Sequence, residues 1–425
     1  MNLQKLVSNL NVEESTATDY FRRISHLLSE APYALTVNWK GSLGIFNMNR
    51  KYSDVSDSAV REANGTIIEA FTNKVVAFSF NGIREYTEPQ YDMFNNNWSD
   101  YEAERLVDGA VTRLYYYGDK WNIATLKCID ARDGHWSSNK NFQELFEEAS
   151  VETGLDYSRL NRNFCYTFIV RHPSNHMIVK YERCSLIHLS TVDLSTLAFV
   201  NHDIGIPRVI NEKFESFDAF LTANAVMTEA PLTEVSNLGY ILTNIKTGDK
   251  TKFENPSYRM ARDLKGNVPN INYQILTLMK KDWTFNTNDN VVTYKDDFLK
   301  YFPHYKTNYE TMEAKFRKTV GYIFNAYLSS TNQNAHKQLD FVVQHTIDEL
   351  YLIAHEENRG NMTIKRTAMY LQSLSAERLS QLLRIPIILK KNKVSRNYPR
   401  DNKLLQGFEW KQRKEYPRTI EVEQS

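Results

Sequence analysis

Residues 106–127 read LVDGAVTRLYYYGDKWNIATLK, and this stretch decides the fold. An entry loop at Val107–Gly109 leads into one strand, and a tight turn at Gly118–Asp119 leads into a second strand. Asp-Gly and Gly-Asp pairs favour turns because glycine adopts positive φ without steric cost. Two β-rich runs joined by two such residues are typical of a hairpin. The stretch therefore predicts antiparallel strands.

The flanking sequence extends this pattern in both directions. Residues 33–90 contain short β-rich runs between turn signals, and further strands are predicted at 165–172, 176–182 and 184–191. Residues 141–155 and 212–226 have helical spacing, and 239–253 form a hairpin with its turn at Thr247–Asp249. After about residue 256, long apolar stripes with a 3.6-residue period predict helices. The sequence predicts an α+β body followed by a helical region.

Composition excludes several classes of protein. The 425 residues are 42% hydrophobic and 12% aromatic with a formal net charge of +1, so we expect globular domains. Cys128, Cys165 and Cys184 are widely spaced and form no Cys/His cluster of metal-ligand spacing, so neither a disulfide scaffold nor a metal site is predicted. No secretion signal or membrane-spanning run is found. We expect a cytoplasmic protein.

Six ordered motifs carry a family resemblance over about residues 30–280. They are Glu62-Ala63-Asn64-Gly65, Val107-Asp108-Gly109-Ala110, Phe164 to Val170 with His172-Pro173-Ser174-Asn175, Leu238-Gly239-Tyr240-Ile241, Lys250-Thr251-Lys252-Phe253, and Asn255-Pro256-Ser257-Tyr258 with 264–269. Their order resembles the ATP-dependent RNA ligases of the phage type and the RNA-ligase-like proteins of large eukaryotic DNA viruses. The resemblance implies an antiparallel-sheet nucleotidyltransferase domain. We predict an N-terminal helical segment (1–30), this domain (31–280), a helical C-terminal domain (281–390) and a basic, aromatic tail (391–425).

The resemblance also implies a chemistry that this chain has largely lost. The family uses a lysine to attack the nucleotide α-phosphate, an arginine on the nucleotide and two glutamates for ribose and metal contacts. The corresponding positions here are Leu106 for the lysine, Asn64 for the arginine, and Ile169 and Leu238 for the glutamates. The viral subgroup often has an apolar residue at the position of Ile169. We expect Leu106, Ile169 and Leu238 to form an apolar floor, where a phosphate would not be desolvated without compensating charge.

Some positions of the motifs remain. Asp108, Gly109 and Gly239 are kept, and we interpret Asp108 as a turn residue rather than a catalytic one. Lys250 and Lys252 lie on one face of a strand, and they are weak candidates for phosphate or RNA contact. Lys120 and Lys127 are the alternatives for a relocated nucleophile, but we interpret both as solvated. The pair His345 and Glu349 has metal-compatible i, i+4 spacing, but no second pair accompanies it.

The end of the chain is the strongest local binding feature. From Lys390 to Arg418 there are ten Lys/Arg residues and three Asp/Glu, with interleaved aromatic residues. Basic side chains neutralise phosphates and aromatic rings stack on single-stranded bases. The predicted nucleic-acid contacts are Lys390, Lys391, Lys393, Arg396, Arg400, Trp410, Lys411, Arg413 and Lys414. A solvated tail, or one docked on its own body, is the alternative.

The sequence thus predicts a catalytically degenerate RNA-ligase-like protein that binds RNA, or joins a protein complex, in viral nucleic-acid processing. We expect no cofactor and no metal. The resemblance also implies a viral factory or the virion as alternatives to a cytoplasmic location. Two alternatives remain open. One is an active ATP-dependent ligase or nucleotidyltransferase with a non-standard nucleophile, using ATP and Mg²⁺. The other is a structural or virion scaffold, which would expose a large apolar patch on the helical region.

Overall fold

The computed structural model describes residues 1–49, 51–285, 293–330, 339–356 and 361–385. The chain divides into two compact units, the first being Met1–Asp263 and the second beginning at Leu264. The division falls earlier than the boundary at 280 that the sequence predicts. The reason is packing, because the helix at 271–285 contacts the later helices of the second unit.

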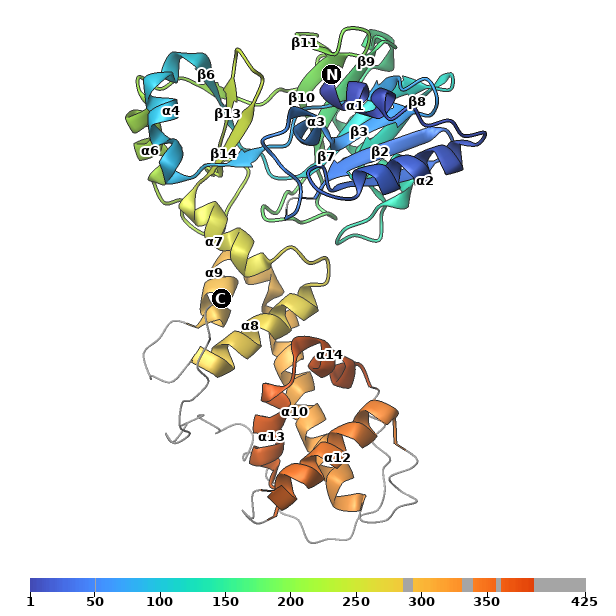
Figure 1. Cartoon of the computed structure of the whole chain (residues 1–425). Helices are drawn as coiled ribbons and strands as arrows, with labels where there is room; N and C mark the ends of the chain where they lie inside the picture. Colours follow the sequence, from blue (N-terminus) through green and yellow to red (C-terminus); the bar gives the residue numbers. More distant parts are fainter. Residues whose placement is uncertain (50, 286–292, 331–338, 357–360, 386–425) are drawn as a thin grey trace. The chain divides into compact units, whose positions relative to one another are not determined.

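The first unit contains three sheets (Figure 1). The first sheet is antiparallel in the order β1-β2-β3-β4. Its strands are β1 (Leu35–Lys40), β2 (Leu43–Met48), β3 (Asn64–Glu69) and β4 (Val75–Ala77), and the helices around it are α1 (Asn2–Asn9), α2 (Ala17–Leu28) and α3 (Ser58–Glu62). Phe21, Ile24 and Leu28 form the buried stripe of α2 and pack into the core of this sheet. The N-terminal segment is therefore part of the first unit.

The second sheet has the order β11-β10-β9-β7-β8 and is antiparallel throughout. Its strands are β7 (Ala110–Tyr117), β8 (Lys120–Thr125), β9 (Phe164–Arg171), β10 (Ser185–Asp193) and β11 (Ala198–Val200), with α5 (Phe142–Thr153) packed against them. Gly118 and Asp119 both have φ of +60°, as the predicted two-residue turn between β7 and β8 requires. The opening stretch is therefore a hairpin at the edge of this sheet.

The third sheet, called the site sheet below, has the order β12-β6-β13-β14-β5. Its strands are β5 (Arg84–Glu85), β6 (Tyr101–Arg105), β12 (Asn211–Glu212), β13 (Gly239–Asn244) and β14 (Lys250–Glu254), and only the β14–β5 pair is parallel. One face packs on α4 (Tyr91–Asn96) and α6 (Phe217–Ala225) through a cluster of aromatic rings. Figure 1 shows both helices on the same side of β6, β13 and β14. The other face is where the candidate site lies.

One predicted strand does not form. Residues 176–182 have β-like composition, but the chain there runs through bends and turns. The backbone amides of Ile178 and Val179 both donate to the carboxylate of Asp108, at 2.9 and 2.8 Å. Because these donors are used by a side chain, they are not available to a neighbouring strand.

Helices make up the second unit. They are the last residues of α7 (Pro256–Lys265), then α8 (Ile271–Phe285), α9 (Tyr294–Tyr301), α10 (Lys306–Ser329), α12 (Phe341–Glu356), α13 (Ile364–Ser373) and α14 (Ala376–Arg384).

Short 3-10 turns occur in both units. They lie at Glu88–Gln90, Trp98–Asp100, Ala131–Asp133, Tyr157–Arg159 and Pro303–Tyr305. The predicted α+β class with antiparallel sheets followed by helices is confirmed. Within the described ranges, no helix combines the length and the apolarity needed to cross a bilayer.

Candidate functional site

The turn at Leu106–Gly109 carries the chain from β6 in the site sheet to β7 in the neighbouring sheet. The backbone amide of Leu106 donates to the carbonyl oxygen of Gly239 at 2.8 Å. Gly239 begins β13, so the second and fourth of the six motifs lie side by side at one end of the site sheet.

Asp108 is buried, with 4% of its surface exposed. One carboxylate oxygen accepts the amides of Ile178 and Val179, and the other accepts the hydroxyl of Tyr258 at 3.0 Å. The hydroxyl of Tyr181 donates to the backbone oxygen of Asp108 at 2.8 Å. Burial, followed by the Asp108 charge, raises the pKa of both tyrosines, so their hydroxyls remain protonated donors. We call Asp108 and these four donors the Asp108 cage; it gives Asp108 a structural role.

The two retained glycines lie where a side chain would not fit. Gly109 has φ of +152°, and a Cβ there would contact Ile169 and lie 2.7 Å from the carbonyl oxygen of Val170. Gly239 has φ of +119°, and a Cβ there would contact the carbonyl oxygen of Phe253. Both glycines are thus explained by backbone geometry and close approach.

Of the four degenerate positions, Asn64 and Ile169 lie on strands β3 and β9, Leu106 directly follows β6 and Leu238 directly precedes β13. Leu106 is half-buried, while Ile169 and Leu238 are 6% and 4% exposed. Asn64 begins β3, and its side-chain amide donates to the carbonyl oxygen of Phe80 at 3.3 Å. Ile169 lies against Gly109, next to the turn that holds Leu106. Apolar side chains therefore occupy the positions at which the resemblance implies an amine and two carboxylates.

Side chains alternate across the site sheet, so its open face can be read from the register. Ala103, Tyr240, Leu242 and Phe253 point into the aromatic cluster under α4 and α6. Residues of the opposite parity therefore share the open face. They are Glu102, Glu104, Ile241, Thr243, Lys250, Lys252 and Glu254.

Both lysines of this face are held by carboxylates. The ammonium of Lys250 lies 2.8 Å from Glu104 on β6 and 2.7 Å from the hydroxyl of Thr243 on β13. The ammonium of Lys252 lies 2.8 Å from Glu254 and 3.4 Å from Glu85. The side chains of Lys250 and Lys252 are 14% and 21% exposed. Each ammonium therefore has a carboxylate partner within the sheet.

Glu254 is the centre of a larger ion-pair group. Its side chain is only 5% exposed, and the guanidinium of Arg262 on α7 pairs with it together with Lys252. Arg259 lies 3.8 Å away on the same helix. Because a buried carboxylate is costly to desolvate without partners, these cations stabilise Glu254 rather than remain available for an incoming phosphate.

Sequence reasoning missed several residues that shape this site. Glu104 and Glu254 were missed because Lys250 lies on another strand than Glu104 and Arg262 lies on a helix outside the strand of Glu254. Tyr258 lies in the quoted Asn255–Tyr258 motif, so a signal was present, but its contact with Asp108 spans 150 residues. Arg113 was also missed; it is fully buried, donates to the carbonyl oxygens of Gly65 and Thr125, and burial lowers its pKa.

The remaining sequence candidates lie elsewhere. Lys120 and Lys127 are exposed at and just after β8. His345 lies 3.7 Å from Glu349, which also pairs with Arg378, so Glu349 already has a cationic partner. The nine candidate residues of the tail, from Lys390 to Lys414, lie outside the described residues, as does the predicted segment 391–425.

Several known proteins are similar to this chain, although no family model matches it. The "Immediate-early protein ICP-46 homolog" of Invertebrate iridescent virus 3 is 23% identical over 347 residues, covering 78% of this chain and 74% of the relative. A "Putative RNA-ligase" of African swine fever virus (isolate Tick/Malawi/Lil 20-1/1983) is 25% identical over 155 residues, 32% of this chain. The match spans only 34% of that relative's length.

A phage protein and a solved structure are also similar. The "RNA ligase" of Rhodothermus phage RM378 is 33% identical over 90 residues, 19% of this chain and 20% of the relative. The structure of a Naegleria gruberi RNA ligase mutant with AMP and Mn matches 44% of this chain and 58% of its own, at 12% identity and a TM-score of 0.32. The sequence relatives confirm the resemblance that the motifs indicate: this chain is similar to the RNA-ligase-like proteins of large DNA viruses.

Proposed function

We propose that this chain is a catalytically degenerate RNA-ligase-like protein that binds RNA in viral nucleic-acid processing. One observation carries the proposal. Where the family has its nucleophilic lysine this chain has Leu106, and the two amines on the open face of the site sheet are held in ion pairs. An amine that is tied to carboxylates of its own sheet is not free to attack a nucleotide phosphate.

The side chains on and beside the open face also support the absence of a nucleotide–Mg²⁺ cofactor. Leu238 and Ile169 are buried apolar residues at the positions where the resemblance implies glutamates. On the open face, Glu104 and Glu254 already have lysine and arginine partners, which leaves the exposed Glu102 as the further carboxylate and both lysines paired. A metal–triphosphate needs free carboxylates for the metal and free cations for the phosphates. The residues present do not fit that group.

Covalent labelling tests the proposal. The purified protein is incubated with α-labelled ATP, and separately with GTP, in the presence of Mg²⁺ or Mn²⁺, and is then run on a denaturing gel. We expect no labelled band, while an active RNA ligase in the same buffer labels strongly. An acid-labile, alkali-stable band would indicate a lysine phosphoramidate and would overturn the catalytic part of the proposal.

The rival function is an active nucleotidyltransferase with a displaced nucleophile. The position of Lys252 favours this rival function. Its ammonium lies on the open face of β14, and β14 is two strands away from β6, the strand that directly precedes Leu106. If a band appears, mass spectrometry of the adduct identifies the lysine. Labelling that is lost in Lys252→Gln and kept in Lys250→Gln would identify Lys252 as the nucleophile.

RNA binding is tested separately. We propose that the basic tail, from Lys390 to Lys414, contributes phosphate contacts, so affinity for a single-stranded RNA should fall steeply as salt is raised. Fluorescence anisotropy of a labelled RNA at several salt concentrations measures this slope. A chain that binds no RNA at low salt would instead favour the scaffold alternative. That alternative is supported by Phe341 and Leu352 of α12, which are 79% and 59% exposed.

A further inference from the structure

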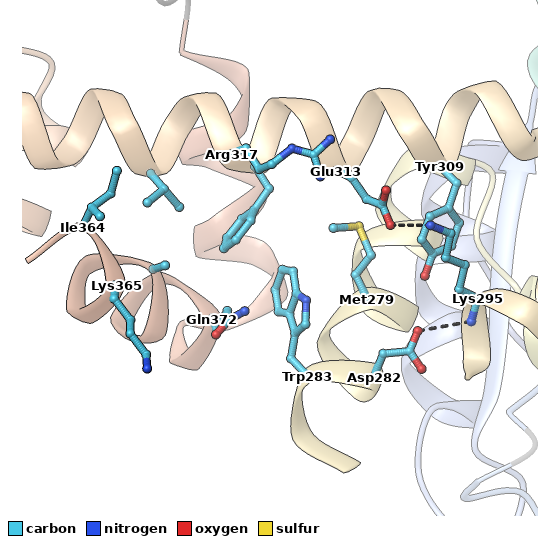
Figure 2. A pocket seen from close by; sticks show the side chains of 13 residues that line it. Met279, Asp282, Trp283, Lys295, Tyr309, Glu313, Arg317, Ile364, Lys365 and Gln372 are labelled. Carbon is cyan, nitrogen blue, oxygen red and sulfur yellow. Dashed lines mark hydrogen bonds and ion pairs between the residues drawn. The ribbon is translucent and has the colours of Figure 1, made fainter. Parts of the chain in front are cut away.

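The helical unit encloses a cavity of about 340 Å³ that the motifs do not involve (Figure 2). Side chains from α8, the start of α9, α10 and α13 line it. Small-molecule pockets usually begin at about 300 Å³. The cavity therefore has room for a ligand the size of a mononucleotide, and its two ends differ in chemistry.

One end is closed by groups that already have partners. The ammonium of Lys295 lies 2.7 Å from Glu313 and 5.2 Å from the centre of the Tyr309 ring. The carboxylate of Asp282 accepts the backbone amides of Tyr294, at 2.7 Å, and of Lys295, at 3.2 Å. These contacts tie α8, α9 and α10 together. This end of the cavity is structural.

The other end is aromatic and apolar. Trp283 is half-buried and projects from α8 towards α10, as Figure 2 shows. Its ring centre lies 4.6 Å from that of Phe316, at an interplanar angle of 36°. Val320, Ile364 and Ala368 complete the apolar lining. A flat indole in such a wall is suited to stack on a planar ring.

Two cations and an amide also line the cavity, and Figure 2 shows the Arg317 side chain running along α10 and the Lys365 side chain directed away from Trp283. Arg317 on α10 and Lys365 on α13 are exposed, and neither has an ion-pair partner among the residues that the structure describes. The side-chain amide of Gln372 also lines the cavity and has no hydrogen-bond partner within the described ranges. This differs from the site sheet, where Lys250 and Lys252 are both neutralised.

We propose that this cavity binds a nucleotide, with the base against Trp283 and the phosphate on Arg317. A base supplies the planar ring that the indole wall favours, and base–aromatic stacking is strong and tolerant of sequence. A phosphate matches the planar guanidinium of Arg317. Gln372 supplies a donor and an acceptor for the edge of the base.

Other ligand classes fit less well. A bare phosphate would leave the aromatic wall unused, and a purely apolar ligand would not use the guanidinium of Arg317. The nucleotide could be free or could belong to an RNA strand, and both present the same base and phosphate. We favour a nucleotide of an RNA strand, and this preference for RNA over a free nucleotide rests on the proposed function. The binding of a nucleotide as such is argued from the cavity alone, which lies wholly within the helical unit.

The test uses the full chain and two probes, AMP and a 5′-phosphorylated, fluorescein-labelled RNA tetramer. We expect AMP to quench tryptophan emission saturably and to compete with the RNA. Trp283→Phe should abolish the AMP-dependent quenching and weaken RNA binding about tenfold. Arg317→Gln should weaken binding several-fold and reduce its salt dependence. Lys318→Gln is the matched control, because it removes the same charge from α10 but does not line the cavity.

Each outcome is decisive. AMP-dependent quenching that is lost in Trp283→Phe, weakened in Arg317→Gln and unchanged in Lys318→Gln supports the site. If the tetramer binds and AMP does not, the ligand of the site is a nucleotide of an RNA strand. Unchanged binding of both probes by correctly folded Trp283→Phe and Arg317→Gln would overturn it. Equal binding of adenosine and AMP would overturn the phosphate contact. RNA binding that does not depend on Trp283 would leave the proposed function standing and remove only this site.

Discussion

The open face of the site sheet and the helical cavity both carry lysine or arginine side chains, yet their charges are used differently. In the sheet, Lys250 and Lys252 lie within 2.8 Å of carboxylates on the same surface. In the cavity, Arg317 and Lys365 have no such partners within the described residues. A cation whose charge is neutralised inside the fold stabilises the fold. A cation without a partner, next to an aromatic wall, remains available for a ligand.

Replacement of Asp108 should have the largest effect on the sheet side of this comparison. Asp108→Ala leaves the amides of Ile178 and Val179 and the hydroxyl of Tyr258 without their acceptor. Buried groups left unsatisfied cost about 1–3 kcal/mol each. We therefore expect the free energy of unfolding to fall by about 3 kcal/mol or more in urea titrations. Asp92→Ala, at an exposed position on α4, should change it by less than about 0.5 kcal/mol.

Acid should weaken the first unit through His188. Its burial, and then the charge of Arg208, lowers the pKa of His188 to about 4. The unfolded side chain has a pKa of about 6.5, so between these values the unfolded chain binds a proton that the native chain does not. Stability is therefore full above about pH 6.5 and falls by roughly 3 kcal/mol as the pH drops to 4.

Hydrogen exchange of peptides from β9 and β10 follows this loss locally, and His188→Gln should flatten the pH profile. An unchanged profile would mean that His188 is not the titrating group.

Asp282 in the helical cavity should affect the pH dependence of stability with the opposite sign, because burial raises its pKa. Its contribution is present below the ordinary carboxyl pKa and is lost as the pH rises through the raised value.

The ion pair between Lys250 and Glu104 should have a smaller effect. Both side chains are partly exposed, so we expect Lys250→Met to cost about 1 kcal/mol. The double change Lys250→Met with Glu104→Gln should recover part of this loss, because it leaves no unpaired charge. A double-mutant cycle measures the coupling. Strictly additive losses would show that the pair is not coupled, and that the lysine is freer than its contacts indicate.

The smallest expected effect comes from restoring the nucleophile alone. Leu106→Lys places an amine at the position implied by the resemblance, but Asn64, Ile169 and Leu238 remain unchanged. Without free phosphate-binding cations and metal-binding carboxylates, no covalent nucleotide should form in the labelling assay. A labelled band with this variant would mean that the open face still binds a nucleotide.

Local patterns predicted much of the fold and little of the site. The hairpin at 106–127 and the helix at 142–153 were found because turn residues and apolar periodicity are encoded by near neighbours. Residues 176–182 were predicted as a strand because composition does not reveal that Asp108, some 70 residues earlier, takes their amides. The partner of Lys250 was missed for the same reason, since Glu104 lies 146 residues away.

The Asp108 cage has a consequence for the order in which the chain becomes stable during synthesis. Its donors come from residues 178–181 and from Tyr258. The full set of hydrogen bonds can therefore form only after the last part of the first unit has been synthesised. Domains generally fold as units from the N-terminus as they emerge. A nascent chain that ends before Tyr258 lacks one of the four donors of the cage, so we expect the first unit to become stable only after Tyr258 has emerged.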